Sequence, residues 1–280
     1  MEDYKKYKLG VIKDEYDEHD YTFKAISPQI ELPDSVDLRP DFPSVFSQNS
    51  QGSCTSNCGI GVLEYLFYIL LGKKLTLSRQ YLYNMERIND KCPLHIDNGS
   101  SMRQICHTLN KNGVCLEELF TYGNGNEKIE PNNEAKTNAQ KYRIKSYHRC
   151  ENANDIKIAL AQGFPVLVGI EVYNGFYNTK SDGIIPKINK TENQYLGGHA
   201  VVLAGYKSNN KKGLFGKKET YYILRNSWEV SEKTEDSWGY AFNNPSDSGF
   251  GENGYGYISE SNLMNILMDS WVITEVENID

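Results

Sequence analysis

The chain has 280 residues, 39% of them hydrophobic and 24% charged, and a formal net charge of −7. These fractions are ordinary for a soluble globular protein, and the length suffices for one large domain or two smaller lobes. The negative charge, without a basic helix or a basic-aromatic stretch, argues against nucleic acid as a partner.

The first seven residues are polar, and the chain has no apolar run of membrane-spanning length. We therefore expect neither a signal peptide nor a membrane association. The expected location is non-secreted, either the cytoplasm of the producing cell or an infected host, or the interior of a virion. Abundant Asn, Lys, Tyr and Ile are compatible with the AT-rich genome of a bacterium or a large DNA virus.

Residues 1–31 form a polar N-terminal arm with an acidic cluster from Asp14 to Asp20. Two interpretations stay open: a solvated tail, or a segment that lies against the folded domain. Leu32 to Pro40 is typical of an extended entry into that domain. We therefore divide the chain into an arm over 1–31 and a folded domain over 32–280.

A buried helix is predicted directly after Cys54. Its apolar residues recur at helical spacing, and the run stops at Gly72. Cys54 would lie at the N-terminus of this helix, where unpaired N–H groups and the helix dipole favour a thiolate. A lone cysteine there is more often only a small buried residue. Shorter helices are expected over 78–88, with Ser78 as the cap, and over 102–110.

The second half changes to a β pattern. We expect a helix over 154–162 and a hairpin turn over 207–218, and the polar stretch 229–249 is expected to be an exposed insertion. Strands are predicted over 164–173, 199–206, 221–225, 255–258 and 271–276. A helical half followed by a β half predicts an α+β protein with two lobes, at about 45–125 and 140–280, and a cleft between them.

The six cysteines are more consistent with free thiols than with disulfides in a non-secreted protein. The pairs Cys106–His107 and Cys92–His95 are weak indications of zinc. We therefore expect no metal and no cofactor.

Cys54, His199 and Asn226 follow one another in the order of a thiol nucleophile, its base and the residue that orients the base. His199 lies in Leu196-Gly-Gly-His-Ala-Val, and Asn226 lies in Arg225-Asn-Ser-Trp. The presence of this histidine and this asparagine makes a catalytic role of Cys54 more probable than its position alone would.

Four motifs in this order resemble the papain-like cysteine peptidase family, in particular its bacterial and viral members with a Gly-Ser-Cys-Thr box. They are Gln48-x5-Cys54, Gly197-Gly-His-Ala-Val, Asn226-Ser-Trp and Gly249-Phe-Gly-Glu-Asn-Gly-Tyr. The resemblance covers about residues 32–275. It implies a helical left lobe, an antiparallel β right lobe and an active-site cleft between them.

The resemblance implies hydrolysis of peptide bonds through a thioester on Cys54, with His199 as general base and acid. Asn226 would orient the imidazole, and Trp228 would cover that hydrogen bond. Gln48 would donate to an oxyanion together with the backbone N–H of Cys54. A thiolate–imidazolium pair is expected at rest. Substrate binding would involve Gly52, Ser53, Asp97, Gly99, Gly198 and Trp228.

Two of these assignments have alternatives. Cys58 competes with Cys54, but only Cys54 lies six positions after a glutamine, as in the family, and Cys58 lies a full turn inside the helix. We assign Cys58 to packing. Asp97 and Gly99 would supply backbone contacts to substrate, although they also fit an ordinary Asx-Gly turn.

The sequence departs from the family pattern at several positions. Thr55 replaces the tryptophan after the nucleophile, Phe250 replaces a second tryptophan, and the insertion 229–249 separates two motifs. The arm over 1–31 is shorter than the usual pro-segment, which argues against a standard zymogen mechanism. We expect it still to contact the lobes, and inhibition of the enzyme by this arm stays open.

Several functions remain open. The expected protein is a monomer that acts on polypeptides. The alternatives are a catalytically silent binding protein on the same scaffold, or an acyl transferase or deamidase that uses the same three residues.

Overall fold

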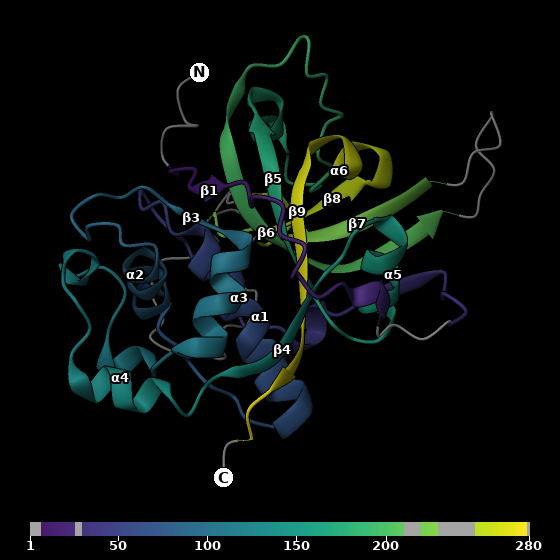
Figure 1. Cartoon of the computed structure of the whole chain (residues 1–280). Coiled ribbons are helices and arrows are strands. Elements are labelled where there is room, and N and C mark those ends of the chain that lie inside the picture. Colours follow the sequence, from purple (N-terminus) through teal and green to yellow (C-terminus); the bar gives the residue numbers. More distant parts are fainter. Residues whose placement is uncertain (1–6, 26–29, 210–218, 229–249, 279–280) are drawn as a thin grey trace.

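The computed structural model describes residues 7–25, 30–209, 219–228 and 250–278 (Figure 1). Helices and strands separate into two halves of the molecule. The helical half contains α1 (Cys54–Leu71), α2 (Arg79–Asn89), α3 (Met102–Lys111) and α4 (Asn133–Ala139). The expected insertion over 229–249 and most of the expected turn over 207–218 lie outside the described residues.

The other half is built on a seven-stranded antiparallel sheet in the order β4-β9-β5-β6-β7-β8, with β2 also paired to β6. Helices α5 (Ala153–Ala161) and α6 (Glu260–Ile266) pack on it. The strands are β2 (Ser35–Asp37), β4 (Ile144–Arg149), β5 (Val166–Tyr173), β6 (Tyr195–Asn209), β7 (Glu219–Arg225), β8 (Tyr255–Ser259) and β9 (Leu267–Val276).

Helix α1 lies at the centre of the protein. The helix ends at Gly72, which has φ +66° and donates its N–H to the carbonyls of Phe67 and Tyr68. Glycine is favoured at this position because its conformation is left-handed. Among the described residues α1 is the one helix long and apolar enough to cross a membrane, but 72% of that stretch is buried. It is therefore the core helix expected from the sequence.

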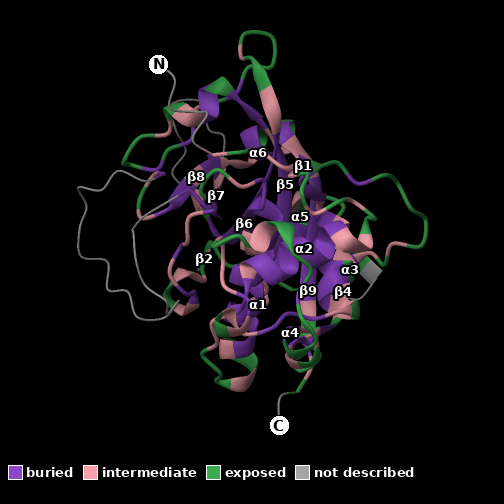
Figure 2. Ribbon diagram, turned by 90° about the vertical axis from the view of Figure 1, so that its left-hand side faces the viewer, coloured by how far each residue is buried: buried purple, intermediate pink, exposed green. Residues whose placement is uncertain are grey.

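Buried residues are purple in Figure 2, and their hydrophobic members form two clusters. One is built around α1, α2 and α3, and it contains Cys54 and Cys58. The other lies beneath the sheet and the helices α5 and α6, and it contains Trp228 and Phe250. The first cluster also includes sheet residues such as Leu167, Trp271 and Ile273, so the helices share an apolar interior with one face of the sheet.

The described part of the N-terminal arm up to Ala25, residues 7–25, is folded against the domain and is not a solvated tail. Its strand β1 (Val11–Ile12) pairs in parallel with β3 (Ser100–Ser101), the segment before α3. Farther along, Phe23 is 1% exposed and Thr22 bridges to Arg149. The arm therefore crosses from one half of the protein to the other, which the contacts of its acidic residues also show.

Two aspartates of the acidic cluster fix the arm in place. The buried Asp14 accepts hydrogen bonds from Trp271 Nε1 (2.9 Å) and from the backbone N–H of Arg103 (3.1 Å). Asp20 pairs with the Arg103 guanidinium (2.7 Å) and with Arg149 (3.3 Å). Because a carboxylate is stable inside a protein only with such partners, these contacts tie the arm to both halves.

Two glutamates are completely buried in the helical half. Glu64 accepts a hydrogen bond from the backbone N–H of Leu77 (2.8 Å), and Glu86 accepts one from Thr55 Oγ1 (2.6 Å). Burial raises the pKa of each carboxyl to about 8, because an ionised carboxylate is poorly solvated there. Both carboxyls therefore hold their protons in the folded protein at neutral pH.

We expect these glutamates to make the protein less stable as pH rises. Their stabilising effect is complete below the unfolded pKa of 4.5 and is lost as pH rises through about 8. Glu64→Gln and Glu86→Gln should each reduce the fall in Tm between about pH 5 and 8, by roughly 2–4 °C per kcal/mol. Thermal unfolding at both pH values measures this, with the exposed Glu130→Gln as control. An unchanged slope in both buried variants would contradict the prediction.

Candidate active site

Cys54 is the first residue of α1 and is completely buried where the two halves meet. The backbone groups of Ala200, on β6, and of Gly10, in the arm, form hydrogen bonds that favour its thiolate. Ala200 directly follows His199 in the chain. The structure therefore brings Cys54 beside the β6 segment that carries the expected base.

His199 and Asn226 lie side by side on neighbouring parts of the sheet. Their side chains join through His199 Nε2 and Asn226 Oδ1 at 2.7 Å. Because the amide oxygen can only accept, Nε2 carries the hydrogen, which leaves Nδ1 as the basic nitrogen. Nδ1 is buried and has no hydrogen-bond partner among the described residues. Trp228 stacks on the imidazole with ring centroids 4.7 Å apart.

Gln48 is fully buried, and its amide has a fixed orientation. Its Oε1 accepts a hydrogen bond from Ser227 Oγ (2.7 Å), so its Nε2 faces the other way. Nε2 donates to the backbone carbonyls of Lys8 (2.8 Å) and Gln51 (2.9 Å). A peptide carbonyl of the arm therefore already occupies the amide donor that is expected to bind the oxyanion.

The arm passes directly over these residues. Tyr7 stacks on Trp228 with centroids 5.3 Å apart. A Cβ on Gly10 would lie 2.2 Å from the carbonyl oxygen of Gly52, and a Cβ on Gly198 would lie 2.3 Å from that of Val11. Backbone thus lies against backbone on both sides of the arm, and glycine is required at these close approaches.

Burial changes both titrating groups of the site. It raises the pKa of the Cys54 thiol to about 11, and it lowers the pKa of His199 to about 4 despite the hydrogen bond to Asn226. Exclusion of water penalises the charged form of each group. The arm-covered structure therefore favours a neutral thiol and a neutral imidazole, in contrast to the ion pair implied by the resemblance.

The other expected substrate-binding residues lie around the same cleft. Asp97 accepts the backbone N–H of Gly52 (3.0 Å), and Ser100, next to Gly99, donates its N–H to the Gly10 carbonyl. Ser53 is buried, and its hydroxyl pairs with Tyr122. Gly52, Gly99 and Gly198 thus contact the arm or its immediate neighbours, whereas Ser53 faces away into the helical half.

Three residues at the site were not identified from the sequence. The backbone carbonyl of Lys8 accepts a hydrogen bond from the Gln48 amide, and Ser227 orients that amide. The hydroxyl of Tyr122 donates to the backbone carbonyl of Gln48 (2.9 Å). Only Ser227 had a signal, because it stands inside the Asn-Ser-Trp motif. Lys8 and Tyr122 occur in polar stretches without a recognisable pattern.

All six cysteines are free. Cys58 is buried one turn after Cys54, and its Sγ donates to the carbonyl of Val201 at 3.1 Å. Burial raises its pKa well above the usual value, as expected of a packing residue. Within the described ranges, no group of three or more His, Cys, Asp and Glu side chains is arranged to hold a metal ion.

The profile of the papain family of cysteine proteases matches residues 32–246. The chain belongs to the papain family of cysteine proteases. A peptidase C1-like protein of Acanthamoeba polyphaga mimivirus is 30% identical over 277 residues, which cover 91% of this chain and 79% of that protein. The family match also identifies the chain as a hydrolase.

Solved structures show the same papain-like architecture. Xylellain, a cysteine protease from Xylella fastidiosa, matches with a TM-score of 0.77 and 27% identity over 98% of both chains. The proform of the ragweed pollen cysteine protease Amb a 11 matches with a TM-score of 0.66 and 22% identity, over 90% of this chain and 70% of that one. The α+β fold with two lobes predicted from the sequence is therefore confirmed.

Proposed function

We propose that this papain-family protease hydrolyses peptide bonds through a thioester on Cys54. The observation that carries the proposal is the hydrogen bond from Gln48 Nε2 to a peptide carbonyl, that of Lys8. His199, oriented by Asn226, supplies the base on the other side of the cleft. A polypeptide can thus be held with its carbonyl on a donor at the start of α1.

The reaction begins with transfer of the Cys54 thiol proton to His199 Nδ1. Sulfur then bonds to the substrate carbonyl carbon, and the resulting oxyanion accepts hydrogen bonds from Gln48 Nε2 and the Cys54 N–H. When the C–N bond breaks, the imidazolium returns its proton to the leaving amine. Water, deprotonated by His199, hydrolyses the thioester and restores the thiol.

Two alternatives use the same scaffold. A silent binding protein is disfavoured because Cys54, His199, Asn226 and Gln48 are all present. Transfer of the acyl group to an amine, or deamidation, passes through the same thioester and needs no further residue. The distinction between hydrolysis and transfer depends on which acceptor reaches that thioester.

Two measurements on the full chain test this proposal. An epoxysuccinyl electrophile should label one thiol, and peptide mapping should place the label on Cys54. Peptide products formed with an added amine should carry free carboxylates, as expected of hydrolysis. Absence of labelling under all conditions would favour the silent scaffold, and amine-capped products would favour transfer.

We also propose that the N-terminal arm inhibits the enzyme by covering the cleft. Its backbone takes the Gln48 donor, and its Tyr7 ring covers Trp228. Substrate needs the same positions, so binding requires the arm to leave. All six free thiols suit a reducing, non-secretory compartment, where we place the enzyme.

Gly10→Ala should open the cleft. The added Cβ would lie 2.2 Å from the Gly52 carbonyl oxygen, a backbone atom that cannot move away alone. Such overpacking typically costs about 1–3 kcal/mol, so Cys54 labelling should become roughly tenfold faster or more. Lys13→Ala, exposed in the same arm, is the control. Equal labelling rates in Gly10→Ala and the wild type would contradict inhibition by the arm.

A further inference from the structure

Thr55 directly follows the expected nucleophile, at the position where the family pattern has a tryptophan. It is 0% exposed in the first turn of α1, and its hydroxyl donates to Glu86 Oε2, on α2, at 2.6 Å. Glu86 is likewise 0% exposed. A completely buried carboxyl group is therefore bonded to the first turn of the helix that carries Cys54.

Ser100 is a second neighbour of this carboxyl group and lies in β3, the strand that pairs with the arm. Its hydroxyl interacts with the Glu86 carboxyl and lowers the pKa of that group. Glu86 Oε1 and Ser100 Oγ are both buried and have no other hydrogen-bond partner among the described residues. A proton on Oε1 can be donated to Ser100 Oγ while Oε2 accepts from Thr55, so the carboxylic acid leaves no atom unpaired.

The ionised form of Glu86 is less well accommodated. The titrating groups that interact with it come from three helices and are Cys54 and Cys58 on α1, Arg87 and Asp90 on α2, and Cys106 on α3. Arg87 is the cation of this set, but it uses its guanidinium for backbone carbonyls and for Asn84 Oδ1. Within the described part of the chain, a carboxylate at Glu86 thus has no cation bonded to it.

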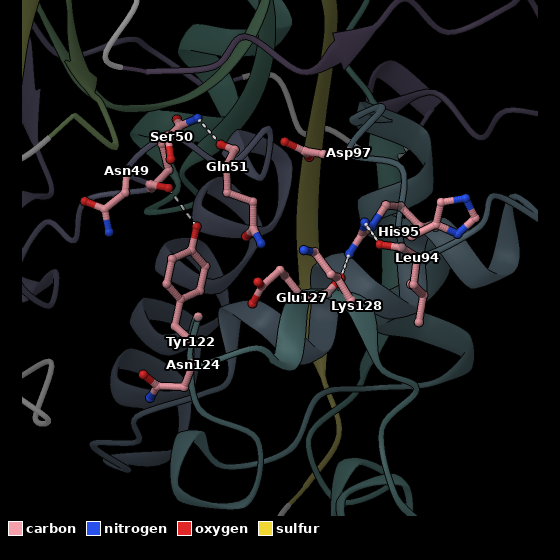
Figure 3. Close-up of a pocket in the computed structure, with 13 residues that line it drawn as sticks. Asn49, Ser50, Gln51, Leu94, His95, Asp97, Tyr122, Asn124, Glu127 and Lys128 are labelled. Atoms are coloured by element: carbon pink, nitrogen blue, oxygen red, sulfur yellow. Dashed lines mark hydrogen bonds between the residues drawn. The ribbon is translucent and has the colours of Figure 1, made fainter.

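A cavity of about 440 Å³ lies near α2 but does not reach this carboxyl group. Figure 3 shows Gln51 and Asp97 among its lining residues; Arg87 also lines it, whereas Glu86 does not. The cavity therefore does not relieve the burial of Glu86, and a negative charge there stays poorly solvated.

We propose that Glu86 is a positioning residue for the nucleophile, which holds the first turn of α1 through Thr55 and keeps Cys54 most reactive while it carries its own proton. The proposal rests on the proposed role of Cys54 and adds a regulation of that site by pH. An ionised Glu86 places a negative charge near Cys54, and this charge raises the pKa of the thiol. Because the thiolate is the nucleophile, loss of the Glu86 proton makes Cys54 less reactive.

Glu86→Gln tests the proposal because glutamine resembles the protonated acid: its oxygen can accept from Thr55 and its NH2 group can donate to Ser100. The measurement is the rate of epoxysuccinyl labelling of Cys54 in the full chain, at saturating electrophile, where arm opening no longer limits the rate. Glu86 loses its proton at about pH 8. The ratio of the variant rate to the wild-type rate should therefore be near one at about pH 6 and about ten at about pH 9, the effect of a charge that raises the thiol pKa by about one.

Glu64→Gln is the matched control. Glu64 is a buried carboxyl group of the same half, and burial also raises its pKa to about 8. It lies on α1 itself, ten residues after Cys54 and about 15 Å farther along the helix axis. Its variant should keep the wild-type dependence on pH. A ratio that stays constant in Glu86→Gln, or that changes equally in both variants, would overturn the proposal.

Thr55 allows a second test that does not depend on the folding of Glu86→Gln. The Thr55 hydroxyl lowers the pKa of Glu86, so Thr55→Val should keep Glu86 protonated to higher pH, whereas Thr55→Ser retains the hydroxyl. The labelling rate of Thr55→Val relative to Thr55→Ser should rise severalfold as pH increases through about 8. A relative rate that does not rise would overturn the proposal.

The same experiment separates this proposal from the peptidase assignment. If Cys54 is not labelled at any pH in the wild type, the proposed nucleophile is wrong and both proposals end. If Cys54 is labelled with a pH dependence that neither Glu86→Gln nor Thr55→Val changes, only the role of Glu86 is wrong.

Discussion

Cys54→Ala is expected to abolish peptide turnover, with a loss on the order of 10⁵- to 10⁶-fold in kcat. No other described thiol is placed to form the thioester beside His199. The measurement is hydrolysis of a peptide library by the full chain, with wild type and variant compared at equal folded concentration. Turnover that survives in Cys54→Ala at more than a trace would contradict the proposed mechanism.

Cys58→Ala is the matched control for this experiment. It removes a sulfur one helical turn away, from the same helix and the same buried cluster. Its loss deletes one weak hydrogen bond to Val201 and leaves a small cavity, so Tm should fall modestly while kcat stays near the wild-type value. If Cys58→Ala folded normally but lost peptidase activity, Cys58 would instead be the nucleophile.

Gln48→Ala should lower kcat by about 100- to 1,000-fold, the usual effect of losing one oxyanion donor. The expectation is large because Ser227 Oγ fixes the Gln48 amide at 2.7 Å, so the donor needs no reorganisation during the reaction. Because Gln48 also holds the Lys8 carbonyl, its loss should loosen the arm. Rates must therefore be compared at saturating substrate, where the measured rate is kcat and no longer depends on how readily the arm opens.

Gln51→Ala supplies the control for Gln48. Its side chain pairs with Gln80, whereas its contribution to Gln48 comes from the backbone carbonyl, which alanine retains. A small effect on kcat is expected. If Gln48→Ala changed only KM, Gln48 would contribute equally to substrate and transition-state binding, and the oxyanion role would be wrong.

The central helix and the inner strands could be predicted because their residues carry regular patterns. The apolar spacing after Cys54, with Gly72 at the end, predicted α1 almost to the residue. Strand β5 could be recognised from its β-branched residues, all of which are buried; Glu171 is the one residue of the strand that is not buried. In both cases the pattern repeats over several turns or pairs, so local sequence is sufficient.

Other elements depend on contacts that are distant in the chain. Helix α4 has only Ala135 and Ala139 buried, so its apolar face is too narrow to show a period. Strand β4 follows a loop and has one fully buried residue, Ile144; its pairing with β9 decides its conformation. Helix α6 ends at Ile266 and β9 begins at the next residue, Leu267, with no Gly, Pro or turn residue between them, which explains why this boundary was missed.

The site divides in the same way. Cys54, His199, Asn226 and Gln48 stand in short motifs that could be recognised before the structure was known. The arm could not be placed, because Asp14 looks like one more charge in an acidic run. Its partners Arg103 and Trp271 lie 89 and 257 residues away, and only the folded chain brings them together.

The close approach of backbones around Gly10 has a consequence for inhibitor design. A short synthetic mimic of Lys8–Leu9–Gly10–Val11 would have to keep its third position free of any substituent, since the Gly52 carbonyl oxygen occupies that space. Its first position could carry an amine to reach Asp97. Compounds with a bulky group at the third position should be rejected by this enzyme, however well their other groups fit.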